Sequence, residues 1–187
     1  IVFGGATADR KDPLWVRPLN SLAAQMLPGT ESGYLPFWSP DSRFIAFFSG
    51  VQLKKIDLSG GPAQTLCELP GTGSGGTWNR EDVILAGTLG RSPLHQVPAT
   101  GGQPKPATAL DASRQETAHQ YPYFLPDGRH FLYLALSAKP DNAGIYVGSL
   151  DSEPPRRVVA ANSNVAFAAP GYLLFAQGQT LMAQPFD

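Results

Sequence analysis

The sequence carries three histidines, the side chains best suited to proton transfer or metal binding near neutral pH. His95, His119 and His130 show none of the spacings typical of a metal-binding helix, such as H-E-x-x-H. We therefore predict no metal site and no cofactor. His119 stands apart because it follows Arg114 and Glu116 within one polar segment. A cation, a carboxylate and an imidazole this close together are suited to binding a small polar molecule or a cation.

The sequence contains no complete motif for nucleophilic catalysis or phosphoryl transfer. Residues 71–76 match G-x-G-x-x-G by letter, but that motif cradles a phosphate only where it follows a strand and opens a helix. We interpret it as a flexible link between repeats. Ser74 lacks a nucleophile elbow, because Thr72 replaces the first glycine of G-x-S-x-G. With no H-R-D or D-F-G signature and no recognisable acid and base pair, we predict no catalytic residue and no enzyme activity.

The elements that must position these side chains follow an internal repeat of about 40 residues. Each unit opens with an aromatic residue, a turn rich in Pro, Asp and Gly, and an apolar run bounded by turn formers. Such a run is typical of a strand buried on both faces. The pattern occurs at Trp38–Phe48, Trp78–Ala86 and Phe124–Leu134, and in degenerate form at residues 169–175.

Two further elements complete each unit. A strand that alternates apolar and polar residues comes next, as at Leu53–Leu58, and a weak outer strand rich in Pro, Gln and Arg suits an exposed sheet edge. Four-stranded units of this length predict an all-β fold, a β-propeller. A β-sandwich would lack the repeat, and helical repeats conflict with 20 Gly and 18 Pro.

The chain forms a single domain of about five whole or partial blades. We place them at residues 1–28 (partial, its second to fourth strands), 34–69, 76–110, 120–160 and 164–187 (partial, its first three strands). This is few for a ring whose ends are incomplete, and the opening at Ile1 without Met also indicates a segment of something longer. We favour part of a six- to eight-bladed ring. A small closed ring and association of chains through the open terminal blades are the alternatives.

In such a propeller, the connection from an outer strand to the next inner strand reaches the rim of the central channel. Loops on a rigid scaffold are where binding residues concentrate. The alternative is a hydrated rim without a specific ligand. The predicted ligand-binding residues at this channel mouth are Glu31, Tyr34, Arg114, Glu116, His119, Asn162 and Asn164.

Charge and hydrophobicity exclude two classes of partner. The net charge is −1 with scattered Lys and Arg, so we predict no nucleic-acid binding. The longest apolar runs, 44–48 and 131–136, are far too short to span a bilayer, so we predict no membrane insertion by this segment. A protein or peptide partner remains the favoured expectation.

The segment Trp38–Phe47, echoed by Phe124–Leu134, resembles the repeat of TolB-like propellers, also called WD40-like or PD40 repeats. Further segments resemble the C-terminal propeller of bacterial membrane-anchored serine/threonine protein kinases. These segments are Leu14–Leu19, Pro36–Phe48, Gly144–Leu150 and Leu181–Asp187. The resemblance implies a bacterial signalling protein, with this part periplasmic or otherwise extracytoplasmic and any kinase activity in a separate domain.

Three functions follow, in order of preference. The first is a non-catalytic module for protein interaction or sensing. The second is a small-molecule or cation sensor that regulates a linked kinase and uses Arg114, Glu116 and His119. The third, a lyase or peptidase accessory domain with its site in the channel, is disfavoured because no acid and base pair is recognisable.

Overall fold

The computed structural model describes residues 1–5, 12–151 and 153–187, and in this part of the chain the strands form five antiparallel sheets. The first sheet contains β1 (Val2–Gly4), β2 (Leu14–Val16) and β3 (Gln25–Met26). The second contains β4 (Tyr34–Trp38), β5 (Phe44–Ser49), β6 (Gln52–Asp57) and β7 (Gln64–Glu68). The third contains β8 (Gly73–Trp78), β9 (Val83–Thr88), β10 (His95–Pro98) and β11 (Lys105–Pro106).

The fourth sheet contains β12 (Glu116–Phe124), β13 (His130–Ser137), β14 (Gly144–Ser149) and β15 (Arg156–Val159). The fifth contains β16 (Val165–Ala168), β17 (Tyr172–Gln177) and β18 (Thr180–Pro185). One short 3-10 helix, η1 (Pro140–Asn142), lies between β13 and β14. Within the described residues, no helix has the length and apolar character needed to cross a membrane.

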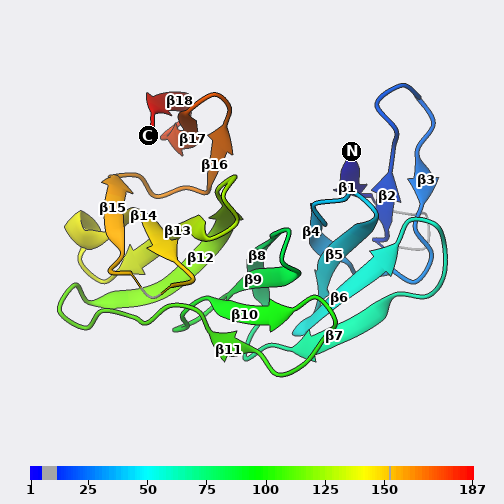
Figure 1. Cartoon of the computed structure of the whole chain (residues 1–187), viewed down its shortest axis with the longest axis horizontal. Helices are drawn as coiled ribbons and strands as arrows, with labels where there is room; N and C mark the ends of the chain where they lie inside the picture. The colour runs from blue at the N-terminus through cyan, green and yellow to red at the C-terminus, as the bar shows by residue number, and fades with distance from the viewer. Residues whose placement is uncertain (6–11, 152) are drawn as a thin grey trace.

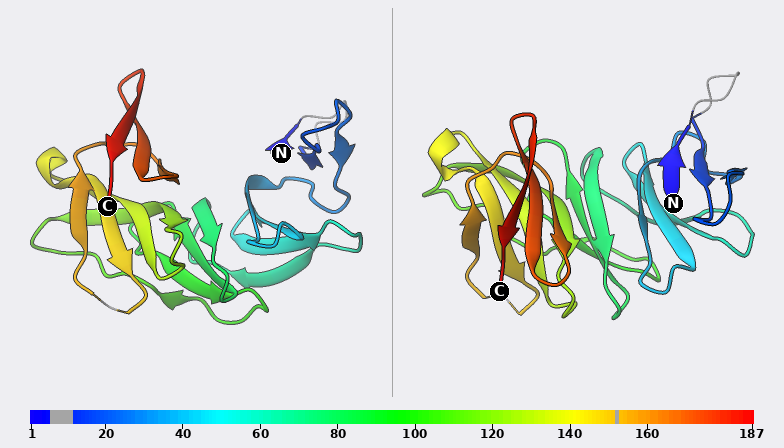
Figure 2. Two further views of the ribbon diagram at one scale, coloured as in Figure 1. Left: turned by 45° about the horizontal axis from the view of Figure 1, so that its top comes forward. Right: turned by 90° about the horizontal axis from the view of Figure 1, so that it is seen from above.

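The sheets stand side by side in an open arc, with the first and last sheets at its two ends (Figures 1 and 2). In the three four-stranded sheets the first strand lies on the inner side of the arc and the last on the outer side (Figure 1). This arrangement confirms the predicted all-β propeller architecture, with the terminal sheets reduced to three strands. The observed sheets start near the expected blade boundaries, although the third begins at Gly73 and the fourth at Glu116.

In the second sheet, the turn between β4 and β5 forms with the predicted turn chemistry. The Asp41 carboxylate accepts hydrogen bonds from the Ser39 hydroxyl at 2.6 Å and from the Arg43 backbone N–H at 3.0 Å. The Ser39 hydroxyl oxygen accepts a further bond from the Phe44 N–H at 2.8 Å. These bonds satisfy the backbone where the chain reverses, so β5 begins at a fixed position.

The core consists of four apolar clusters, each between two neighbouring sheets. In β5, Ile45 and Phe47 pack toward the first sheet, whereas Ala46 and Phe48 pack toward the third. All four side chains are fully buried, because successive residues of a strand point to opposite faces and both faces are covered here. Burial of both faces explains why residues 44–48 are apolar without interruption.

The glycine-rich segment is not the flexible link that we expected, because residues 73–76 belong to β8. A Cβ at Gly73 would lie 2.2 Å from the Phe48 ring, and a Cβ at Gly76 would lie 2.3 Å from the Phe37 ring. Glycine is therefore needed at both positions because aromatic rings of the second sheet press against the backbone. Packing between sheets, rather than mobility, accounts for this composition.

The first strands of the three middle sheets share a β-bulge at equivalent positions. Pairing shifts register around Leu35, Gly75 and Tyr121, and all three have positive φ, at 47°, 118° and 51°. This left-handed conformation costs an ordinary residue such as Leu or Tyr roughly 1–2 kcal/mol. The fold holds this strain on the strands that line the inner side of the arc.

Candidate functional site

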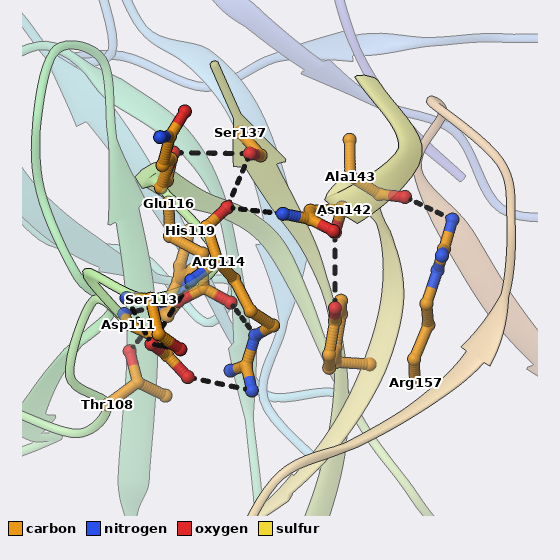
Figure 3. Close-up of polar contacts among 12 residues, drawn as sticks. Thr108, Asp111, Ser113, Arg114, Glu116, His119, Ser137, Asn142, Ala143 and Arg157 are labelled. Carbon is orange, nitrogen blue, oxygen red and sulfur yellow. Dashed lines mark hydrogen bonds and ion pairs between the residues drawn. The ribbon is translucent and has the colours of Figure 1, made fainter. Parts of the chain in front are cut away.

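A buried polar cluster occupies the start of β12, where the sequence predicted part of a ligand site (Figure 3). Glu116 is its centre, with one carboxylate oxygen 2.9 Å from Nε of Arg114 and the other 3.0 Å from Nε2 of His119. The Asp111 backbone N–H donates to the same carboxylate at 2.6 Å. Glu116 is completely buried and His119 is 1% exposed, so this carboxylate is held by three donors away from water.

The protonation state of His119 follows from its burial and its two partners. The Glu116 carboxylate can only accept, so Nε2 carries the proton that is donated to it. In the neutral ring Nδ1 then accepts from the Thr108 hydroxyl at 2.7 Å, while the Thr108 oxygen accepts from the Leu94 N–H at 3.0 Å. Burial lowers the pKa of His119, and this outweighs the opposing effect of Glu116. The neutral ring joins the third sheet to the fourth.

Further bonds fix Arg114 itself. Its guanidinium also contacts the Asp111 carboxylate at 2.9 Å and lies 5.2 Å from the centre of the Tyr146 ring. Its carbonyl oxygen accepts bonds from Ser137 and Asn142, as Figure 3 shows. The polar atoms of this cluster are thus largely bonded to one another, as expected of a buried network that fixes a connection between blades.

The other predicted mouth residues do not join this cluster. Glu31 accepts a bond from the Gly29 N–H at its own turn, and Asn162 and Asn164 are exposed side chains near the start of the fifth sheet. Tyr34 has a structural contact instead: its hydroxyl donates to the Gly50 carbonyl at 2.8 Å and accepts from the Gly73 N–H at 3.0 Å. The structure therefore brings together Arg114, Glu116 and His119, and leaves the remaining four apart. Among the described residues, no group of three or more His, Cys, Asp or Glu is placed to hold a metal ion.

A large groove lies at the opposite end of β12, roughly 25 Å along the strand from Glu116 at about 3.3 Å per residue. It has a volume of about 610 Å³ and crosses the second, third and fourth sheets. A second cavity of about 460 Å³ continues from it, between the second and third sheets. We call the larger cavity the hairpin groove, because it lies among the turns that join first and second strands. Its walls are mostly prolines and aromatic side chains, including Pro36, Phe37, Trp38, Pro40, Tyr123, Phe124 and Pro126.

The hairpin groove was not predicted from the sequence, although its residues occupy repeated positions. Trp78 packs between the second and third sheets, where its ring stacks on that of Phe44 with ring centres 6.1 Å apart. Trp78 nevertheless also lines the groove. One pattern in the sequence could have indicated the groove: proline stands next to aromatic residues on two inner strands, at 34–38 and 121–124.

Most polar groups in the hairpin groove already have partners. The Thr77 hydroxyl oxygen accepts from the Phe124 N–H at 3.2 Å, and the Asn79 amide donates to the Gly128 carbonyl at 2.8 Å. The Tyr123 hydroxyl donates to the Phe167 carbonyl at 3.2 Å. In the described part of the chain, no side-chain hydrogen bond or ion pair holds the guanidinium of Arg80, which is exposed. The groove thus offers aromatic and proline side chains together with one unused cationic donor.

Five antiparallel sheets side by side around a common inner side, each burying a core against the next, define a β-propeller. This fold is similar to that of TolB propellers. The putative TolB from Agrobacterium tumefaciens superposes with a TM-score of 0.66 at 19% identity, over 86% of this chain and 58% of that one. At this identity the likeness establishes the fold. Neither a family model nor a curated protein matches the sequence.

Two further similar structures are described as enzymes. The tricorn protease has a TM-score of 0.63 at 15% identity, over 92% of this chain and 18% of that one. An oligogalacturonate lyase in complex with manganese has a TM-score of 0.54 at 12% identity, over 94% of this chain and 66% of that one. The chain therefore spans two thirds or less of the length of these three proteins. The similarity to kinase-linked propellers stays a prediction.

Proposed function

We propose that this protein is a non-catalytic module that binds an extended peptide segment of a protein partner. The observation that carries the proposal is the hairpin groove, formed by aromatic and proline side chains from three successive sheets. Its volume of about 610 Å³ falls within the usual range of ligand sites. It lies on the inner side of the arc, next to strands whose bulges hold Leu35 and Tyr121 in a strained conformation.

The groove favours a peptide because of its shape and chemistry. It runs across sheets rather than into one, and the adjoining cavity lengthens it past Trp78. Aromatic and proline surfaces bind apolar and proline-containing segments with little loss of conformational entropy on the protein side. The bound partner would displace water from the aromatic and proline side chains that line the groove.

We also propose the cellular location and the parent protein that the sequence resemblance implies. We place the module in a bacterial signalling protein, on the extracytoplasmic side, with any kinase activity in another domain. Peptide binding would then act as the sensed signal. The support for this setting is the sequence resemblance alone, because the structural likenesses bear on the fold.

Self-association through the terminal sheets is a second part of the proposal. The first sheet exposes Ile1, Phe3 and Met26, and the fifth exposes Leu181 and Met182. Each terminal sheet thus presents apolar side chains that a neighbouring blade would cover. Light scattering over a range of concentrations tests this point: a rise in mass that Met182→Lys abolishes supports it, and a constant monomer mass contradicts it.

Peptide binding can be tested with a random peptide library displayed on phage. Peptides enriched on the immobilised protein are then titrated by fluorescence polarisation against Trp38→Ala and against Trp15→Ala, a tryptophan of the first sheet outside the groove. We expect Trp38→Ala to weaken binding at least tenfold and Trp15→Ala to leave it unchanged. Failure to enrich any peptide over bare resin, or equal binding by both variants, would reject the proposed function.

A further inference from the structure

Arg80 is unusual among the turn residues that surround the hairpin groove. It stands second in the turn Asn79–Asp82, at the position that Pro40 and Pro126 occupy in the neighbouring sheets. Proline is well suited to that position because its φ is already near the value that the turn requires. The turn of the third sheet therefore has no structural need for arginine, and a large cationic side chain replaces a small apolar one.

Arg80 also differs from the arginines beside the equivalent turns of the neighbouring sheets, because each of those is paired with a carboxylate. Arg43 contacts the Asp57 carboxylate at 2.8 Å, and Arg129 contacts the Asp151 carboxylate at 2.5 Å. In the described part of the chain, no carboxylate lies within 4.0 Å of the Arg80 guanidinium, although the side chain lines both the hairpin groove and the adjoining cavity. Asn79 holds the turn beneath it, because its side-chain oxygen Oδ1 accepts from the backbone N–H groups of Glu81 and Val83 at 3.0 and 2.9 Å.

The unused polar group of the groove is a donor. The Arg80 guanidinium has no acceptor capacity, so a ligand that bonds to it must supply acceptors. The planar guanidinium matches a carboxylate, with two parallel N–H···O bonds. Arg80 is the one charged side chain among the residues that line the hairpin groove, and it is exposed, so the carboxylate of a ligand can reach it.

We infer that the peptide bound in the hairpin groove carries an acidic side chain that pairs with Arg80. This inference rests on the proposed function. The groove does not end at Arg80, because Pro40, Trp78 and Asn79 also line both cavities. The chain of the ligand can therefore continue past Arg80, which favours an aspartate or glutamate side chain over a terminal carboxylate.

The adjoining cavity limits the ligand to one acidic residue at this point. Asp41 and Asp82 line it, and each is held in place: Asp41 by the Ser39 hydroxyl and Asp82 by the indole N–H of Trp78 at 3.2 Å. Their carboxylates disfavour a second negative charge just beyond Arg80. The expected ligand is an apolar or proline-containing segment, one acidic residue, and then a neutral or basic residue.

The charge of the selected peptides tests the inference. Peptides selected on the wild-type protein are synthesised with amidated ends, in the acidic form and with Asp or Glu replaced by its amide. We expect the amide to bind at least tenfold more weakly, as for loss of a charged hydrogen bond. Arg80→Glu should lose the acidic peptides and bind Lys-substituted versions, whereas Arg91→Glu, on a distant loop, should behave as wild type.

The outcomes separate this inference from the proposed function. Enriched peptides without an acidic residue, or acidic and amide forms of equal affinity on a folded protein, would overturn the role of Arg80 and leave peptide binding intact. A thermal melt of Arg80→Glu that matches the wild type establishes that the variant is folded. No enrichment of any peptide would remove both proposals.

Discussion

Glu116 and His119 form a buried bond between a carboxylate and a neutral imidazole, with 3.0 Å between Oε2 and Nε2. The ring is fixed from its other side by Thr108, which follows the outer strand of the preceding sheet. One carboxylate therefore helps to join two sheets through a single histidine. Removal of either partner leaves a polar group in a site that water does not reach.

We expect Glu116→Gln to destabilise the fold by roughly 2–4 kcal/mol, because Arg114 and the His119 N–H both lose a charged acceptor. Urea denaturation followed by tryptophan fluorescence measures the change. Glu31→Gln is the matched control, and we expect an effect within about 0.5 kcal/mol at that exposed turn. Equal stability of both variants would show that the network does not stabilise the sheets.

The pH dependence of stability should contain two opposite contributions from histidine. The pKa of His119 is lowered, chiefly by burial, so its contribution is present above pH 6.5 and decreases as the pH falls below that value. Asp127 and Glu153 raise the pKa of His130, so its contribution is present below pH 6.5 and is lost as the pH rises through the raised pKa.

Urea midpoints measured from about pH 5 to about pH 8 separate these contributions. We expect His119→Gln to flatten the acidic side of the profile and His130→Gln to flatten the other side. The effect of His130 should be smaller because that side chain is partly exposed. If the urea midpoint of His119→Gln fell with decreasing pH as steeply as that of the wild type, the assignment of a neutral ring to His119 would be wrong.

Gly73→Ala should cost about 1–3 kcal/mol, because the added methyl group would overlap the buried Phe48 ring. Gly4→Ala is the control, since a Cβ there meets nothing within 4 Å. Thermal unfolding of the two variants gives the comparison. If Gly73→Ala were as stable as Gly4→Ala, the packing of β8 against the second sheet would be looser than described.

Leu35→Gly should leave stability unchanged or raise it slightly, although glycine normally weakens a strand. Leu35 is 43% exposed with φ at 47°, and relief of about 1–2 kcal/mol of strain offsets the added chain entropy. Leu181→Gly, on an exposed strand without positive φ, should cost about 1 kcal/mol. A larger loss for Leu35→Gly in chemical denaturation would argue against strain at the bulge.

Much of the fold could be predicted from the sequence because its signals are local. The run 44–48 is apolar at every position, and only a strand covered on both faces needs that pattern. The bulge at Leu35 and the tight packing at Gly73 could not be predicted. Both depend on where a neighbouring sheet lies, which no short segment specifies.

The candidate site was predicted less well for the same reason. Arg114, Glu116 and His119 are close in sequence, so their meeting in space was foreseeable. Tyr34, also predicted at the channel mouth, accepts a bond from the Gly73 N–H of the next sheet, and no local pattern in the sequence indicated that contact. The hairpin groove combines residues about 90 positions apart, from Pro36 to Pro126, and only the arrangement of whole sheets brings them together.

Each apolar cluster of this protein joins only adjacent sheets, and the sheets form an open arc. In such an arrangement stability is a sum of the sheets and the interfaces between neighbours, so a sheet with two large interfaces opens less readily than a sheet with one. We expect the third sheet, covered on both sides by four-stranded neighbours, to exchange its amide hydrogens most slowly. It also carries Arg80 and Trp78, so the middle of the hairpin groove stands on the sheet that we expect to open last.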